Sequence, residues 1–202
     1  MQKQKRQFLS ATVAGAIAGA GVIPALARAQ HAPKTTAGPT LLTVSGLIGE
    51  GNRGPLDPAL DQMMAKQKLS FSKAHAFDFA ALAALPAMAI NPTLEYDNKP
   101  HTLKGPLLTD VLKASGVKVN DRTTLFLRAV DGYAASVTAN EAIKRRFILA
   151  THLDGRPMAL GGLGPLWAVY DADRFADMAA KPVTERFASC PWATYHIEVK
   201  EG

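Results

Sequence analysis

Two Asp-Gly dipeptides, each placed directly after a β-prone apolar run, set the strongest limit on how this chain folds. The first, Asp131-Gly132, divides the segment Thr123–Val137 into the runs TLFLRAV and YAASV. The second, Asp154-Gly155, follows the run Phe147–Leu153. Asp-Gly is favoured in two-residue hairpin turns because both central residues of such a turn need positive φ. The sequence therefore predicts two β-hairpins built from short strands.

Short helical patterns separate the strand-like runs. Asp78 stands where it can cap a helix over Phe79–Leu85, and Gly116 is placed to end an amphipathic helix over Leu107–Ser115. Thr138 stands at capping-box spacing from a glutamate, which predicts a further helix through residue 146. Other strands are expected at Leu41–Ser45, Leu69–Phe77, Leu166–Tyr170 and Ala193–Val199, and another helix at Ala59–Lys68. This order predicts a mixed, β-rich α+β domain with short peripheral helices, without alternating βαβ units.

The first 29 residues have the pattern of an export signal. Residues 1–29 combine a basic start with an Ala/Gly-rich apolar stretch, and small residues offer cleavage sites near Ala27 or Ala29. A membrane anchor is the alternative, but such helices are richer in Leu and Ile. We expect a periplasmic protein whose mature chain has no membrane span.

The export route and the domain boundaries follow from the same region. Lys5-Arg6 and the three residues after it resemble the twin-arginine export motif with lysine in place of the first arginine. Both the twin-arginine and the general secretory route therefore stay open. Residues 30–40 are polar and bear Pro and Gly, as is typical of a linker. We expect one folded domain over residues 41–202.

Charge argues against a nucleic-acid partner. The full chain has a formal net charge of +6, but export would remove four basic residues and no acidic one. The remaining 19 basic and 17 acidic residues are interspersed, without the basic stripe that nucleic-acid binding requires. The one basic cluster, Lys144-Arg145-Arg146, is interpreted as a solvated helix end.

Cysteine and histidine patterns identify no metal site. Cys190 is the only cysteine, which excludes an internal disulfide and any multi-cysteine metal site, and we expect it to be a buried small hydrophobe. The five histidines are scattered, and no phosphate loop or nucleophile elbow is present. Trp167 and Trp192 are expected as core anchors. No catalytic or metal-ligating residue is assigned.

Seven segments, in this order, resemble a known family. They are LTVSGLI (Leu42–Ile48), FDFAALAALP (Phe77–Pro86), KGPLLTDVLKASG (Lys104–Gly116), AVDGYAASV (Ala129–Val137), ILATHLDGRPM (Ile148–Met158), GPLWAVY (Gly164–Tyr170) and the ending Trp192–Val199. The series is similar to the small exported members of the sulfite-oxidase-type molybdopterin-binding oxidoreductase domain family. The resemblance implies a mixed α+β fold and, in catalytic branches, a pterin cofactor that carries molybdenum.

The chain departs from that family at the metal ligand. Catalytic members bind molybdenum through a cysteine in the segment that matches Pro92–His101, and this segment has no cysteine here. Glu95, Tyr96 or His101 would offer only harder oxygen or nitrogen donors. The first hypothesis is therefore a periplasmic ligand-binding or sensory and accessory module for a small anionic or pterin-like ligand. The alternatives are a molybdenum-dependent oxidoreductase with a non-cysteine ligand, and a structural or interaction protein with an empty pocket. A periplasmic protein is the other kind of partner that we consider.

Six residues are candidates for a ligand pocket. The resemblance places the glycines of Gly161–Pro165 near the cofactor, although a plain turn before the next strand also explains them. Tyr133 follows the first Asp-Gly turn and either faces the pocket rim or is a half-buried strand tyrosine. Arg128 lies within an apolar strand and either faces solvent or holds an anion. The candidates are Arg128, Tyr133, Gly161, Gly162, Gly164 and His101.

Overall fold

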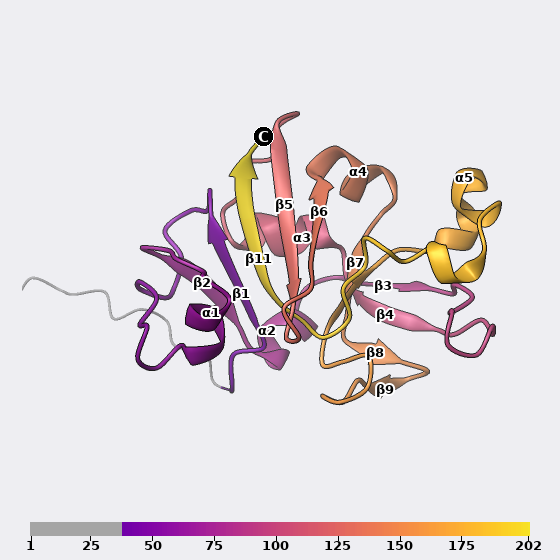
Figure 1. The fold of residues 1–202 in the computed structure, drawn as a ribbon, viewed down its shortest axis with the longest axis horizontal. Helices are drawn as coiled ribbons and strands as arrows, with labels where there is room; N and C mark the ends of the chain where they lie inside the picture. Colours follow the sequence, from indigo (N-terminus) through magenta and orange to yellow (C-terminus); the bar gives the residue numbers. More distant parts are fainter. Residues whose placement is uncertain (1–37) are drawn as a thin grey trace, which may run out of the picture. The chain divides into compact units, whose positions relative to one another are not determined.

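A computed structural model describes residues 38–202, which form the mixed α+β domain that the sequence predicts (Figure 1). The export signal expected over residues 1–29 lies outside the described residues, as do residues 30–37 of the expected linker. Within the described part, every helix is too short or too polar to cross a bilayer.

A five-stranded sheet forms the centre of the domain. Its strands, in spatial order, are β2 (Ala74–Phe77), β1 (Leu42–Gly46), β11 (Thr194–Glu201), β5 (Thr123–Ala129) and β6 (Ala134–Thr138). The first and last strands of the domain, β1 and β11, pair in parallel, and the other neighbours are antiparallel. The β5–β6 hairpin confirms the first predicted hairpin. Strand β2 is shorter than predicted, because residues 69–73 lie outside the ladder.

The predicted strand Phe147–Leu153 is wrong in one respect, because it divides at Thr151 between two smaller sheets. Strand β7 (Ile148–Ala150) pairs with β10 (Trp167–Val169), whereas β8 (His152–Leu153) pairs with other strands. The four-stranded sheet has the order β3 (Ala87–Ile90), β4 (Leu103–Pro106), β8 and β9 (Arg156–Pro157), and lies at the right of Figure 1. The Asp154-Gly155 turn joins β8 to β9 with positive φ at both residues, which confirms the second hairpin.

Side-chain caps fix the starts of two helices as the sequence predicts. The Asp78 carboxylate accepts from the backbone N–H of Ala81 at 2.7 Å, and the Thr138 hydroxyl accepts from that of Glu141 at 3.1 Å. Gly116, with φ of +73°, follows the third helix. The helices are α1 (Gln62–Lys66), α2 (Phe79–Ala83), α3 (Leu108–Ala114), α4 (Ala139–Lys144) and α5 (Ala176–Ala179), with 3-10 turns η1 (Ala172–Arg174) and η2 (Val183–Glu185).

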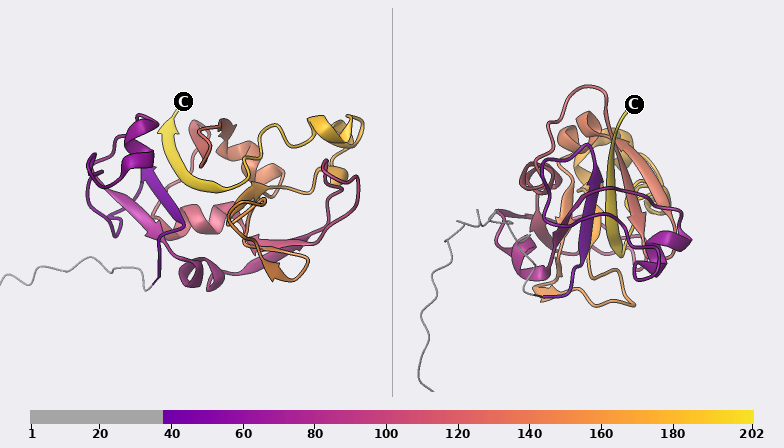
Figure 2. Two further views of the ribbon diagram at one scale, coloured as in Figure 1. Left: turned by 60° about the horizontal axis from the view of Figure 1, so that its bottom comes forward. Right: turned by 90° about the vertical axis from the view of Figure 1, so that its left-hand side faces the viewer.

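The main core lies between the inner face of the central sheet, strands β7 and β10, and helices α2 to α4. Strands β7 and β10 are completely buried, which explains their continuous apolar runs. Rings of Phe147 and Tyr170 pack here with centroids 4.8 Å apart. A smaller, separate cluster consists of Met64, Leu69 and Tyr195. Met64 belongs to α1, and Figure 2 shows the course of this helix and of the sheet from two further sides.

Candidate functional site

A cavity of about 250 Å³ gathers three exposed aromatic side chains, and we call it the aromatic cavity. Tyr96, Tyr133 and Trp192 line it and are 56%, 50% and 38% exposed. Two carboxylate residues, Glu95 and Asp131, lie in the same lining. Large aromatic side chains left open to solvent in one concave site are typical of a binding surface.

The turn between β5 and β6 positions Tyr133. The Asp131 carboxylate accepts from the backbone N–H of Tyr133 at 2.9 Å, and the N–H of Ala129 donates to the Tyr133 carbonyl at 2.9 Å. The Tyr133 hydroxyl donates to the backbone carbonyl of Ala188. The hairpin therefore carries one wall of the aromatic cavity and holds the opposite wall through this hydrogen bond.

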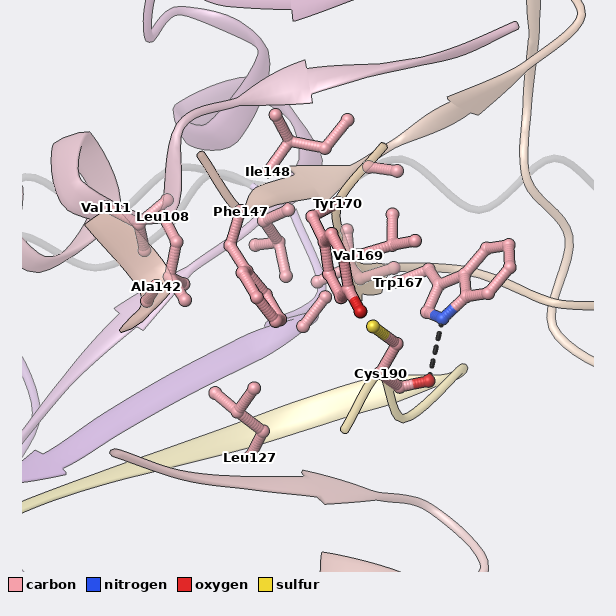
Figure 3. Close-up of a cluster of buried hydrophobic side chains, with 14 of the residues drawn as sticks. Leu108, Val111, Leu127, Ala142, Phe147, Ile148, Trp167, Val169, Tyr170 and Cys190 are labelled. Carbon is pink, nitrogen blue, oxygen red and sulfur yellow. Dashed lines mark hydrogen bonds between the residues drawn. The ribbon is translucent and has the colours of Figure 1, made fainter. Parts of the chain in front are cut away.

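The segment before β11 forms that opposite wall. The Trp167 indole N–H donates to the Cys190 carbonyl at 2.8 Å, while the Cys190 sulfur points toward Tyr170 within the core (Figure 3). Trp167 is a core anchor, as predicted. Trp192 is not, because its indole lies in the aromatic cavity instead. A proline before it and a left-handed residue after it, Ala193 with φ of +48°, turn the chain outward here.

Cys190 behaves as the buried small hydrophobe that the sequence predicts. It is 4% exposed, and burial raises the pKa of its thiol to about 12. A thiol in such surroundings stays protonated at neutral pH and is no metal ligand. Among the described residues, no group of three or more His, Cys, Asp or Glu side chains stands close enough to hold a metal ion.

The loop segment Pro92–His101, which contains no cysteine, reaches the aromatic cavity. Leu94 and Asn98 close a tight turn, with the Asn98 N–H donating to the Leu94 carbonyl at 3.0 Å, and this turn presents Glu95 and Tyr96. Burial, together with the Glu95 carboxylate, raises the pKa of Tyr96 to about 12. Tyr96 is therefore a neutral phenol that can donate a hydrogen bond.

The charge of the lining does not fit molybdopterin. The described residues that line the aromatic cavity include two carboxylates and neither lysine nor arginine. Molybdopterin carries a phosphate, which needs cationic or N–H donors, and a metal that thiolate ligands suit best. A lining rich in acceptors instead suits a ligand that presents N–H donors.

Arg128 lies on the outer face of the central sheet and is absent from the lining of the aromatic cavity. Its guanidinium forms an ion pair with Glu198 at 3.2 Å. Its neighbour across the ladder, His196, is 1% exposed and forms a 2.9 Å hydrogen bond with the Ser45 hydroxyl. Arg128 is therefore part of a polar cluster on the outer face.

The three candidate glycines serve the turn before β10. Gly161 has φ of +97° with open space around it, and the Gly162 N–H donates to Ala159 at 3.3 Å. A Cβ on Gly164 would lie 2.4 Å from the Cβ of Met158. None of the three lines the aromatic cavity. The need for glycine at these positions is thus explained by a turn and by close packing against Met158.

His101 lies between two carboxylates and also stands apart from the aromatic cavity. Its Nδ1 is 2.7 Å from an Asp154 oxygen, and its Nε2 is 3.1 Å from an Asp97 oxygen. These hydrogen bonds raise the pKa of His101 above its usual value. The imidazole ring ties the loop after β3 to the β8–β9 turn.

We expect the substitution Asp154→Asn to lower the pKa of His101, because it removes the carboxylate whose hydrogen bond raises that pKa most. The pKa is measured from the imidazole carbon-bound proton shifts in an NMR titration. The matched variant Asp121→Asn, a carboxamide exchange elsewhere on the surface, leaves that pKa unchanged. An unaltered pKa in Asp154→Asn would contradict the arrangement of His101.

Comparisons with known proteins find a likeness in fold among solved structures but none in sequence. No family model matches the sequence, and no curated protein matches it. Among solved structures, the chain is similar to the crystal structure of the sulfane dehydrogenase SoxCD from Paracoccus pantotrophus, with a TM-score of 0.49 and 14% identity. The match covers 80% of this chain but 38% of that chain, so this protein spans well under half of its neighbour's length. The likeness carries no argument about activity.

Proposed function

We propose that this protein is a ligand-binding domain whose aromatic cavity holds a small, flat, pterin-like heterocycle. One observation carries the proposal: Tyr96, Tyr133 and Trp192 are exposed in a single cavity that also contains two carboxylates. The aromatic rings supply surfaces for stacking on a flat ring. The carboxylates accept hydrogen bonds from ring N–H and amino groups, which a pterin presents along one edge.

The expected binding energy comes from these two kinds of contact. An aromatic pair contributes about 0.5–1.5 kcal/mol beyond the area that it buries. A hydrogen bond to a charged group contributes about 1.5–3 kcal/mol. Glu95 and Asp131 therefore select which edge of the ring faces the carboxylates, and the aromatic side chains favour a flat ligand.

The wider role that we propose is that of an exported sensory or accessory module. The basic, Ala/Gly-rich residues 1–29 support export to the periplasm. The seven ordered segments support descent from the sulfite-oxidase-type molybdopterin-binding domain, and the missing cysteine supports a binding role over a redox one. The oxidoreductase alternative has less support, because the aromatic cavity offers neither a thiolate nor a cation for the cofactor's phosphate.

The proposal is tested by titrating the protein with pterin and following heat release and tryptophan fluorescence. Trp167 is buried and Trp192 is exposed, so we expect binding to quench the Trp192 component. Glu95→Gln and Trp192→Ala should each raise the Kd about tenfold, equivalent to about 1.4 kcal/mol. The first removes a charged acceptor, and the second removes a stacking surface.

The matched control is Glu50→Gln, which neutralises an exposed carboxylate outside the aromatic cavity and should leave the Kd unchanged. Each variant is first shown to keep the unfolding midpoint of the unaltered protein. Absence of pterin binding, or equal weakening by Glu50→Gln, would refute the proposed function.

A further inference from the structure

We propose a second binding site in this protein, for an anionic headgroup attached to an apolar body. The site is a separate cavity of about 250 Å³, which we call the basic cavity. It lies between the end of α4, strand β3 and the segment that follows β10. Its lining residues are Met88, Ile90, Lys144, Arg145, Arg146, Asp171, Arg174 and Phe175.

The end of α4 brings three consecutive cations to this cavity. The helix ends at Lys144, Arg145 caps it, and Arg146 has a left-handed φ of +54°. This turn reverses the chain, so that Lys144, Arg145 and Arg146 all reach one concave surface. The prediction of a solvated helix end is therefore correct for the helix end but misses the cavity.

Arg145 is a fixed wall of the basic cavity. Its guanidinium contacts the carboxylates of Glu141 at 3.1 Å and Asp177 at 2.7 Å. It also lies over the rings of Tyr170 and Phe175, at 5.2 and 5.5 Å from their centroids. Two carboxylates already neutralise its charge, so Arg145 shapes the cavity, and other cations attract the anion.

Arg146 and Arg174 are those other cations. Neither guanidinium has a carboxylate within 4.0 Å among the described residues, and Arg146 instead donates to the sulfur of Met88 at 3.0 Å. Asp171 is the single carboxylate residue in the lining, and one of its oxygens accepts the backbone N–H of Asn91 at 3.3 Å. The cavity therefore keeps an excess of unpaired positive charge, which favours an anion.

The remaining lining selects an apolar body behind the headgroup. Met88, Ile90 and Phe175 give the cavity an apolar wall next to the guanidinium groups. A free inorganic anion would leave this wall in contact with water, whereas a ring or short chain would cover it. The shared chemistry is thus a carboxylate, phosphate or sulfate group on a ring-sized apolar body.

The probe is phenyl phosphate. Inorganic phosphate and phenol, which correspond to its two parts, are the reference ligands. We expect calorimetry to detect phenyl phosphate binding that is at least about tenfold tighter than that of either half. Arg146→Gln and Arg174→Gln should each weaken binding about fivefold, because each removes a guanidinium charge that no carboxylate neutralises. Binding should also weaken as salt is raised.

Two control variants separate this site from other surfaces. Arg156→Gln removes an exposed arginine in β9, and Trp192→Ala alters the aromatic cavity; both should leave phenyl phosphate binding unchanged. The proposal is overturned if phenyl phosphate fails to bind at about 10 mM, where a weak millimolar complex would still form. It is also overturned if inorganic phosphate binds as tightly, or if Arg156→Gln is as damaging as Arg174→Gln.

Discussion

Replacing Gly105 by alanine should lower the free energy of unfolding by about 3 kcal/mol or more. A Cβ at this position would lie 2.0 Å from the carbonyl oxygen of Leu149 and 2.7 Å from its carbonyl carbon. Both contacts are with backbone, so no side-chain rotation relieves them. Strands β4 and β7 would have to separate in the centre of the core, where Leu149 is completely buried.

The matched control is Gly54→Ala. A Cβ on Gly54 meets nothing within 4 Å, and its backbone is not left-handed, so this variant should be neutral or more stable by about 0.4–1 kcal/mol. Urea denaturation of both variants gives the comparison. If Gly105→Ala unfolded at the same urea concentration as Gly54→Ala, the close approach of β4 and β7 would be wrong.

Acid should destabilise the protein between about pH 6.5 and pH 4 because of His196. Burial, aided by the nearby Arg128 guanidinium, lowers the pKa of His196 to about 4. The unfolded chain therefore takes up a proton near pH 6.5, whereas the folded protein does so only near pH 4. Stability is full above pH 6.5 and falls as the pH drops, by about 3 kcal/mol in total.

The surroundings of His196 explain why protonation is unfavourable. Ser45 occupies its Nε2, and Phe71 stacks on the ring with centroids 6.3 Å apart. Arg53 and Arg128 lie close enough to repel a second positive charge, and Glu198 opposes them only in part. The imidazole is therefore held in its neutral form within the outer polar cluster.

The test compares urea denaturation from pH 7.5 to pH 4 for the unaltered protein and for His196→Gln. Glutamine keeps a polar group near Ser45 but does not titrate. We therefore expect the free energy of unfolding of this variant to fall less between pH 6.5 and pH 4 than that of the unaltered protein, even if it is lower at every pH. If the free energy of unfolding fell equally with pH in the two proteins, groups other than His196 would be responsible for the acid sensitivity.

Local chemistry made much of the fold predictable from sequence. Asp78 and Thr138 cap helices, and the two Asp-Gly turns form hairpins, because each depends on residues only a few positions apart. The division of the second hairpin strand at Thr151 instead involves β4, which lies far away in sequence, since the Thr151 N–H donates to the Lys104 carbonyl at 2.9 Å. The parallel pairing of β1 with β11 likewise joins opposite ends of the described domain.

The candidate site was predictable only in part for the same reason. Tyr133 was found because a turn signal precedes it. In sequence, Glu95 and Tyr96 stand out only as oxygen donors, because nothing local indicates that their loop meets the β5–β6 hairpin. Trp192 was assigned to the core because indoles are large and apolar, whereas its neighbours in the chain turn it outward.

The same limit applies to the basic cluster at the end of α4. Residues 144–146 look like a solvated helix end in sequence, since the nearest carboxylate, Glu141, pairs with Arg145 alone. The other walls of the basic cavity come from β3 and from the segment after β10, including Met88 and Arg174. The sequence thus predicts where the charges lie along the chain, whereas the cavity that they line depends on contacts between segments far apart in sequence.

Backbone amide NMR of the protein titrated with pterin tests the central claim most directly. We expect chemical-shift changes confined to residues 95–96, 129–133 and 184–192, the three segments that supply the lining of the aromatic cavity. Loss of these changes in Trp192→Ala would tie them to stacking. Shift changes centred on residues 144–146 and 171–175, or none at saturating pterin, would contradict the account.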